Sequence, residues 1–228
     1  PTAGLSRDDA AARRALYGAN RVSPPLSCPS WVCCLLPCLL RTSSMQSFHA
    51  ALPREAVVRR KLNVPASNRS NTAAPGAKRA LRMDAASLVF GDVVELRAGD
   101  LVGADMRVLE CSPDCVVDQS TLTAEEDNED DDEDIEASER SLVRKWVAAT
   151  SDDADPLRAR NVLLMASRVV RGSAVGVVIC TGDRTFWGQL LASHQWPVRS
   201  DKGRRVETHR LMGGRKTSQA SPRGELLV

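Results

Sequence analysis

Residues 90–100 read FGDVVELRAGD and carry the signal that decides the fold class. Val93 and Val94 form a short β-branched run with an acidic residue on either side. Gly91 precedes the run, and the pair at residues 99–100 follows it as a turn signal. A short apolar run between turn signals predicts a β-strand, so we expect a strand within residues 88–97.

Similar short runs recur on both sides of this stretch and predict further strands. They lie at residues 56–58, 106–109, 115–117, 162–165, 168–170 and 174–180. Several short strands at close spacing, separated by turn residues, are typical of a compact β-sandwich or jelly roll. We therefore expect a mainly β (α+β) domain with flanking helices, in which residues 88–117 and 162–180 form one β unit.

Three segments predict helices. Ser6 can cap a first helix, and Asp9 completes a capping box three residues later; the helix is expected to end at Gly18. A second helix fits residues 44–52, and a third fits residues 185–192, because apolar residues recur there at helical spacing.

Charge is balanced over the chain but not along it. Lys plus Arg number 31 and Asp plus Glu 29, so the bulk charge indicates no partner. Residues 125–139 contain eleven acidic residues and no base, and we expect them to form a solvated acidic insert. Residues 194–228 are basic and polar and are expected to form a disordered tail. Residues 199–223 of this tail offer no aromatic platform for stacking, so nucleic-acid binding is not expected.

Cysteines and apolar runs exclude two further classes. The seven cysteines are odd in number and follow no secretory signal, which favours reduced thiols and no disulfide framework or metal site. The longest apolar run, residues 31–40, is interrupted by Pro37 and is shorter than the roughly 20 residues of a spanning helix. We expect a soluble cytoplasmic monomer without a membrane span.

Taken together, the blocks at residues 90–96, 98–100 and 104–107 resemble the actuator domain of P-type cation-transporting ATPases. Residues 117–123, VDQSTLT, resemble the approach to the Thr-Gly-Glu-Ser loop of that family. Residues 160–162 and 181–185 are similar to its closing strands and exit helix. Residues 4–20 and 45–58 resemble the sodium/potassium-pump branch, and the resemblance covers roughly residues 4–24 and 44–192.

The resemblance implies a distorted jelly-roll fold and a specific chemistry. In the family, an aspartyl phosphate forms on a separate phosphorylation domain, and a loop glutamate orients or deprotonates the water that hydrolyses it. By position, Glu125 is that residue, and Thr123 helps to hold the loop through its hydroxyl. The intact family uses ATP and magnesium; no cofactor is expected in this chain itself.

The chain also departs from the family pattern. The loop reads Thr123-Ala124-Glu125-Glu126, and Gly103 stands where the family has proline. The 228 residues contain neither the Asp-Lys-Thr-Gly phosphorylation motif nor a nucleotide domain, so we expect the chain alone to be catalytically inactive. Proteins of this family are associated with a membrane, and the resemblance implies that the actuator domain lies at its cytoplasmic face.

The expected organisation has four parts. Residues 1–24 form an amino-terminal helix segment, residues 25–43 a short apolar remnant in place of the first two membrane spans, residues 44–193 the actuator domain with the acidic insert, and residues 194–228 the tail. Two functions stay open: the actuator part of a cation pump, and a freestanding, non-enzymatic regulatory module that uses the insert and tail as contact surfaces. Glu125 is either the functional glutamate or simply the first residue of a solvated loop.

Structural roles are expected for the remaining acidic candidates. Asp100, Asp105 and Asp118 stand at turns or strand ends, where hydrogen bonding within the fold is a commoner role than metal binding. Cys180, at the end of a strand, is expected to act as a small core residue.

Overall fold

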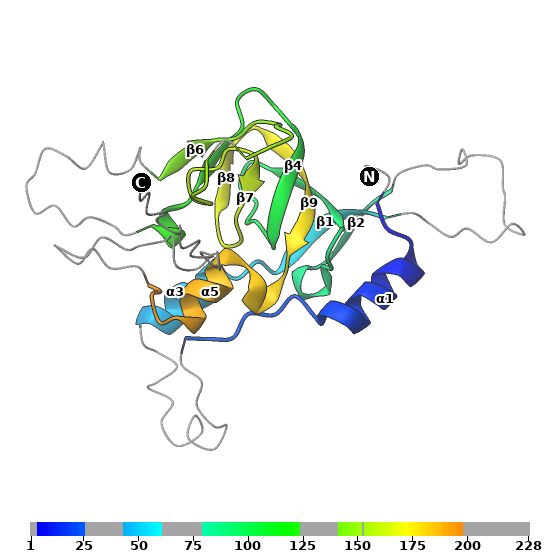
Figure 1. The fold of residues 1–228 in the computed structure, drawn as a ribbon, viewed down its shortest axis with the longest axis horizontal. Helices are drawn as coiled ribbons and strands as arrows, with labels where there is room; N and C mark the ends of the chain where they lie inside the picture. Colours follow the sequence, from blue (N-terminus) through cyan, green and yellow to red (C-terminus); the bar gives the residue numbers. More distant parts are fainter. Residues whose placement is uncertain (1–3, 26–42, 61–78, 124–140, 152, 198–228) are drawn as a thin grey trace, which may run out of the picture.

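The computed structural model describes residues 4–25, 43–60, 79–123, 141–151 and 153–197. They form two antiparallel β-sheets with helices against them (Figure 1). The larger sheet has six strands in the order β2-β1-β3-β9-β4-β7, and the smaller has three in the order β6-β5-β8. The mainly β fold expected from the sequence is confirmed.

The strand bounds are as follows: β1 Glu55–Arg60, β2 Arg79–Asp84, β3 Val93–Arg97, β4 Asp105–Cys111, β5 Val116–Asp118, β6 Leu142–Arg144, β7 Val162–Leu163, β8 Arg168–Arg171 and β9 Ser173–Cys180. The long strand β9 lies between β3 and β4, so the two halves expected to form one β unit do so. In the smaller sheet, Val117 pairs with Val143 on one side and with Val169 on the other.

One core fills the space within the two sheets. It consists mainly of valine, alanine and leucine and includes Val58, Val94, Met106, Val117 and Val169, all without solvent exposure. A backbone bridge between Leu101 and Arg168 brings the start of β8 next to the turn that follows β3. The β-branched runs of the sequence are therefore the strands that close around this core.

The strand expected within residues 88–97 is β3, which begins at Val93, and residues 88–92 form a turn before it. Gly91 has a φ of +83°, and the fully buried Asp92 carboxylate accepts a hydrogen bond from the Val89 N–H (3.0 Å), which makes a turn. Arg60 donates to both oxygens of Asp92, at 2.7 and 3.0 Å. This long-range ion pair stabilises a turn that local periodicity cannot reveal.

Three helices lie against the sheets: α1 Arg7–Tyr17, α3 Ser43–Ala51 and α5 Phe186–Ala192. The N-cap expected at Ser6 is confirmed, because Ser6 Oγ accepts from the Asp9 N–H; the same hydroxyl donates to the Asp9 carboxylate. No helix in the described residues is long and apolar enough to cross a membrane.

Helices α3 and α5 enclose a second, aromatic core. Phe48 on α3 stacks on Trp187 of α5 with ring centroids 5.3 Å apart, and Trp196 packs edge-on against both rings. Trp196 lies within the segment expected to be a disordered tail, yet it is only 5% exposed. The layer formed by α3, α5 and the aromatic core between them, here called the helical layer, therefore continues at least to Trp196.

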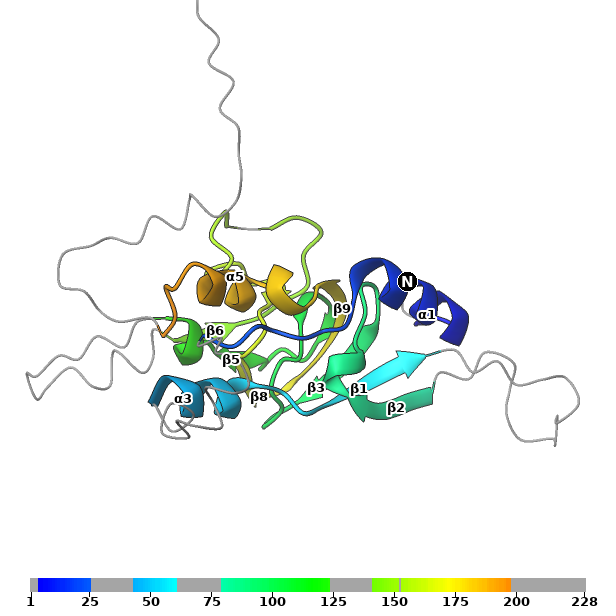
Figure 2. The same cartoon turned by 90° about the horizontal axis from the view of Figure 1, so that it is seen from below.

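Residues 19–23 run along the surface of this core toward α5 (Figure 2). Asn20 is buried and donates to the carbonyls of Ala85 and Gly103, while its oxygen accepts from the Gly182 N–H. Ser23 binds both carboxylate oxygens of Asp183. The segment is thus hydrogen-bonded to three separate parts of the domain.

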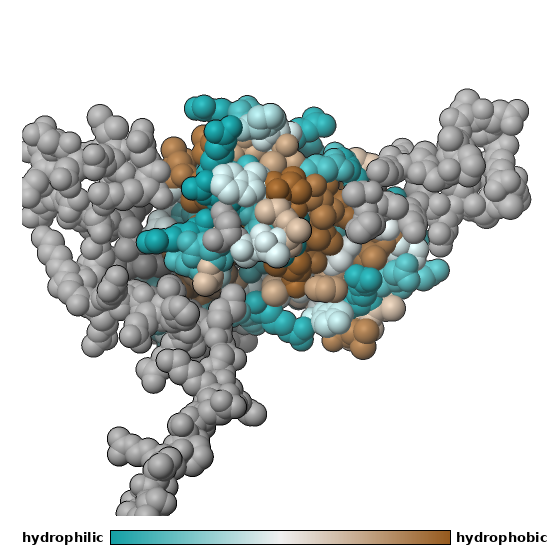
Figure 3. Space-filling model, turned by 45° about the horizontal axis from the view of Figure 1, so that its top comes forward, coloured by the Kyte–Doolittle hydropathy of each residue, from teal (hydrophilic) through white to brown (hydrophobic). Residues whose placement is uncertain are grey.

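Some large apolar side chains stay exposed on separate elements, among them Leu16 on α1, Leu81 on β2 and Val147 after β6. Isolated exposed apolar residues are ordinary on protein surfaces. On the face shown in Figure 3, apolar surface gathers across the middle and polar residues border it. Three parts of the predicted organisation lie outside the described residues: residues 26–42, the acidic insert at 125–139 and the tail beyond residue 197.

Candidate functional site

The candidate site begins where β5 ends, at Asp118. Its carboxylate accepts hydrogen bonds from the Ser120 N–H (2.8 Å) and from Ser120 Oγ (3.1 Å), which closes a tight turn. A 3-10 helix, η4, follows at Ser120–Leu122, and Leu122 is buried in the aromatic core. The structural role expected for Asp118 is confirmed, because both of its oxygens serve this turn.

Thr123 is the last described residue before the loop. Its N–H lies 3.2 Å from the Gln119 carbonyl and 3.3 Å from that of Ser120, and its hydroxyl lies 3.4 and 3.5 Å from the same two oxygens. Its backbone is extended, with φ −104° and ψ 156°, so the chain leaves the turn here. Ala124, Glu125 and Glu126 lie outside the described residues, and the roles of Glu125 and Thr123 stay predictions.

A buried pair of polar side chains, Gln119 and Lys145, supports the turn. Gln119 is 1% exposed, and with its amide oriented to satisfy both groups it donates to the Leu157 carbonyl and accepts from Lys145 Nζ at 3.1 Å. Lys145 is equally buried, and its ammonium also donates to the Ala159 carbonyl at 2.9 Å. Because a buried polar group is costly when unsatisfied, this network favours a single position of the turn.

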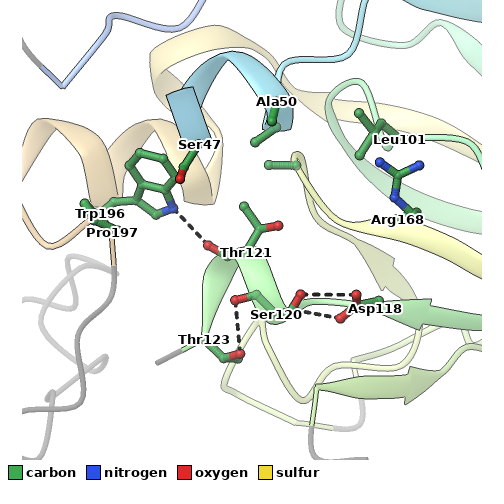
Figure 4. Close-up of a pocket in the computed structure, with 12 residues that line it drawn as sticks. Ser47, Ala50, Leu101, Asp118, Ser120, Thr121, Thr123, Arg168, Trp196 and Pro197 are labelled. Atoms are coloured by element: carbon green, nitrogen blue, oxygen red, sulfur yellow. Dashed lines mark hydrogen bonds between the residues drawn. The ribbon is translucent and has the colours of Figure 1, made fainter. Parts of the chain in front are cut away.

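A cavity of about 430 Å³ opens beside the turn (Figure 4). Its wall comes from α3, from the turn after β5, from the start of β8 and from residues 196–197. Trp196 Nε1 donates to the Thr121 carbonyl (2.9 Å), which ties the end of the helical layer to the turn. The candidate loop thus starts from a turn that contacts both helices of the aromatic core.

Asp105 has a structural role in the same region. Its carboxylate accepts from the Met165 N–H at 2.8 Å and from the Phe186 N–H at 2.7 Å, so it joins β4 to the start of α5. Burial raises the pKa of Asp105 to about 6, and the two backbone hydrogen bonds oppose that rise.

Asp100 also has a structural role, because its carboxylate accepts a hydrogen bond from the Arg97 N–H at its turn. Within the described residues, no group of three or more His, Cys, Asp or Glu side chains could hold a metal ion such as magnesium.

Cys180 only partly fits the expected core role. It is half-buried at the end of β9, opposite Asp105, and burial raises the pKa of its thiol. Gly103 is a tight position, because an added Cβ would lie 2.9 Å from Leu88 Cδ1. Its carbonyl accepts a hydrogen bond from the Asn20 amide at 2.7 Å.

Sequence reasoning missed two residues that hold this site, Lys145 and Trp196, and a third, Asn20, that holds residues 19–23 on the domain. Asn20, Lys145 and Trp196 all act through partners far away in the sequence. Trp196 could have been noticed as an aromatic residue in an otherwise polar segment. Neither Asn20 nor Lys145 carries a local signal, since both read as ordinary surface residues.

The two sheets, the flanking helices and the turn that leads into a loop define the actuator class of domain. A profile of the P-type ATPase actuator domain matches residues 67–195, more than half of the chain, and the chain belongs to this family.

Among curated proteins, the chain is similar to sodium/potassium-transporting ATPase subunits. It is 33% identical to subunit alpha-3 of Gallus gallus over 146 residues, and 32% identical to subunit alpha-3 of Homo sapiens over the same length; each match covers 64% of this chain and 11% of the relative. Subunit alpha-2 of Gallus gallus is 33% identical over 148 residues, which cover 65% of this chain and 11% of the relative. The chain thus matches about a tenth of the length of these relatives.

Proposed function

We propose that this chain provides the actuator domain of a cation-transporting P-type ATPase of the sodium/potassium-pump type, at the cytoplasmic face of a membrane. In this role its loop at residues 123–126 promotes hydrolysis of an aspartyl phosphate carried by a phosphorylation domain. ATP and magnesium serve the formation of that phosphate in the family.

The observation that carries the proposal is the turn from Asp118 to Thr123. The Asp118–Ser120 hydrogen bonds, the buried Leu122 and the Gln119–Lys145 pair place Thr123 at a fixed point. Residues that act on a reacting phosphate need such a rigid base, because a displacement of about 1 Å can lower the rate about a hundredfold. The segment that starts at Thr123 therefore follows a turn that hydrogen bonds and a buried side chain support.

Glu125 then acts as a general base. A water oxygen attacks the phosphorus atom, its proton passes to the Glu125 carboxylate, and the bond from phosphorus to the aspartyl oxygen breaks. The products are inorganic phosphate and a free aspartate. A positioned base of this kind contributes about 10²- to 10⁴-fold to the rate, and Thr123 acts as a positioning residue at the base of the loop.

A chimeric pump tests this function. Residues 44–197 replace the matching segment of the Gallus gallus alpha-3 subunit, and ATP turnover is measured in membranes. We expect turnover with the unaltered segment, and a loss of about 10²-fold or more in Glu125→Gln. A chimera that assembles, forms phosphoenzyme and turns over equally well with Glu125→Gln would overturn the proposal.

A further inference from the structure

The cavity beside the turn has walls of two kinds. Ala50, Leu101, Trp196 and Pro197 are apolar parts of the lining, and α3, the turn and β8 contribute polar side chains. Figure 4 shows Thr121 in the middle, with Ser47, Trp196 and Pro197 to its left and Leu101 and Arg168 to its right. At about 430 Å³, the cavity falls within the range of small-molecule sites in proteins, about 300–1,000 Å³.

Its polar side offers hydrogen-bond donors that the fold does not use. Within the described residues, the hydroxyls of Ser47 and Thr121 have no hydrogen-bond partner. The Arg168 guanidinium binds the Gly99 carbonyl through Nη1 at 2.9 Å and makes no other hydrogen bond or ion pair with a described residue. Two hydroxyls and most of a guanidinium therefore line one space.

The acidic residue of the cavity is already engaged. Asp118 stands opposite Arg168 in the register of β5 and β8, yet the two form no ion pair, because both Asp118 oxygens face Ser120. An anion next to Arg168 thus competes with no carboxylate for the guanidinium. Guanidinium groups bind carboxylates and phosphates through paired, charge-assisted hydrogen bonds.

We propose that this cavity binds a small organic anion. Its carboxylate or phosphate group lies against Arg168, with the Thr121 hydroxyl as a further donor, while Ser47 lies beside Trp196. Its apolar part lies on Ala50, Trp196 and Pro197. The bound molecule touches α3, the turn and residues 196–197 at once, and so fixes the turn relative to α3.

Binding has a regulatory consequence, which rests on the proposed function. Residues 123–126 follow this turn in the sequence, so a ligand that bridges the turn and α3 acts next to the segment that the proposed function uses. The organic anion is therefore an effector of the dephosphorylation step and not its substrate.

The test uses the full chain, isothermal titration calorimetry and ¹H–¹⁵N NMR, with phenyl phosphate as the probe. We expect saturable binding that shifts the indole N–H signal of Trp196, which is bonded to the Thr121 carbonyl. Arg168→Gln is expected to weaken binding about ten- to hundredfold, the effect of one charge-assisted hydrogen bond. Arg171→Gln is the matched control, because Arg171 lies on the same strand but does not line the cavity.

Further arms separate the possible sources of a signal. Ala50→Leu fills the apolar side and is expected to weaken phenyl phosphate binding even if Arg168→Gln fails to fold. Inorganic phosphate carries the anionic group without the ring, and benzyl alcohol carries the ring without the anionic group. Each is expected to bind at least about tenfold more weakly than phenyl phosphate. The proposal is overturned by an absence of saturable binding, by equal losses in Arg168→Gln and Arg171→Gln, or by equal affinity for inorganic phosphate.

Binding and function fail separately. If phenyl phosphate binds as expected but Glu125→Gln leaves the chimeric pump unaltered, the site stands and the proposed function falls. If Glu125→Gln stops turnover but no probe binds, the function stands and the site falls.

Discussion

Asn20→Ala tests whether residues 19–23 are an integral part of the domain. The Asn20 amide is 5% exposed and forms hydrogen bonds of 2.9 Å to the Ala85 carbonyl, 2.7 Å to the Gly103 carbonyl and 2.8 Å from the Gly182 N–H. The Ala85 carbonyl keeps a second partner, the Leu88 N–H. The Gly103 carbonyl and the Gly182 N–H lose their described partner, so the substitution leaves two unsatisfied groups in a buried place.

The size of the effect follows from those two groups. An unsatisfied buried donor or acceptor costs about 1–3 kcal/mol, so Asn20→Ala is expected to lower the free energy of unfolding by about 2–6 kcal/mol. For a domain of this size the melting temperature falls by about 2–4 °C per kcal/mol, which predicts a decrease of roughly 10 °C.

Urea unfolding followed by circular dichroism measures this change, with thermal unfolding as a second readout. Gln195→Ala is the matched control, since it removes a similar amide side chain from an exposed position without a side-chain hydrogen bond in the described residues. It is expected to change stability by less than about 0.5 kcal/mol. If Asn20→Ala costs no more than Gln195→Ala, residues 19–23 do not pack on the domain as described.

Two further predictions concern the contacts of α5 and the residues after it. Burial raises the pKa of Asp105 from 3.8 to about 6, so the folded state binds this proton more tightly than the unfolded state does. The free energy of unfolding should therefore fall by about 3 kcal/mol, relative to Asp105→Asn, as the pH rises from about 4 to about 6; urea unfolding between pH 4 and 7.5 measures this, and parallel curves for the two proteins would contradict it. Trp196→Ala removes a buried indole that packs against Phe48 and Trp187, and is expected to cost about 3–5 kcal/mol. A loss below about 1 kcal/mol in the same assay would show that the domain ends before Trp196.

The sequence revealed those parts of the fold that have local causes. The β-branched run at residues 174–180 predicted most of β9, because a strand buried in the middle of a sheet must be apolar on both faces. The N-cap signal at Ser6 predicted the start of α1, because the hydrogen bond that forms the cap joins residues only three apart. In both cases the determining contacts lie within the pattern that was read.

Other elements could not be found in this way. β2, at Arg79–Asp84, has no β-branched residue and pairs only with β1, so it is a strand through its backbone ladder and not through its side chains. β6 has three residues, too few for a period. The turn at residues 88–92 depends on the ion pair of Asp92 with Arg60, which is 32 residues away. Contacts between distant parts of the chain determine β2, β6 and this turn, and the local sequence pattern does not indicate such contacts.

The candidate site likewise has one part with local causes and another part that depends on distant residues. The motif at residues 117–123 indicated where the loop begins, and the Asp118 turn has a local cause in the Ser120 hydrogen bonds. The support beneath it comes from Lys145 and Trp196, which reach the turn from distant parts of the chain. The roles of Thr123 and Glu125 rest on resemblance and stay predictions.

The decay of phosphoenzyme in a single turnover tests the central claim most directly. The chimeric pump carrying residues 44–197 is phosphorylated with radioactive ATP, chased with unlabelled ATP, and sampled in acid over time. Glu125→Gln is compared with Glu126→Gln, which removes a neighbouring charge from the same loop. If Glu125 is the base that activates water, phosphoenzyme should form in both variants but decay about 10²-fold or more slowly in Glu125→Gln alone. Equal decay rates in Glu125→Gln, Glu126→Gln and the unaltered chimera would contradict the assignment.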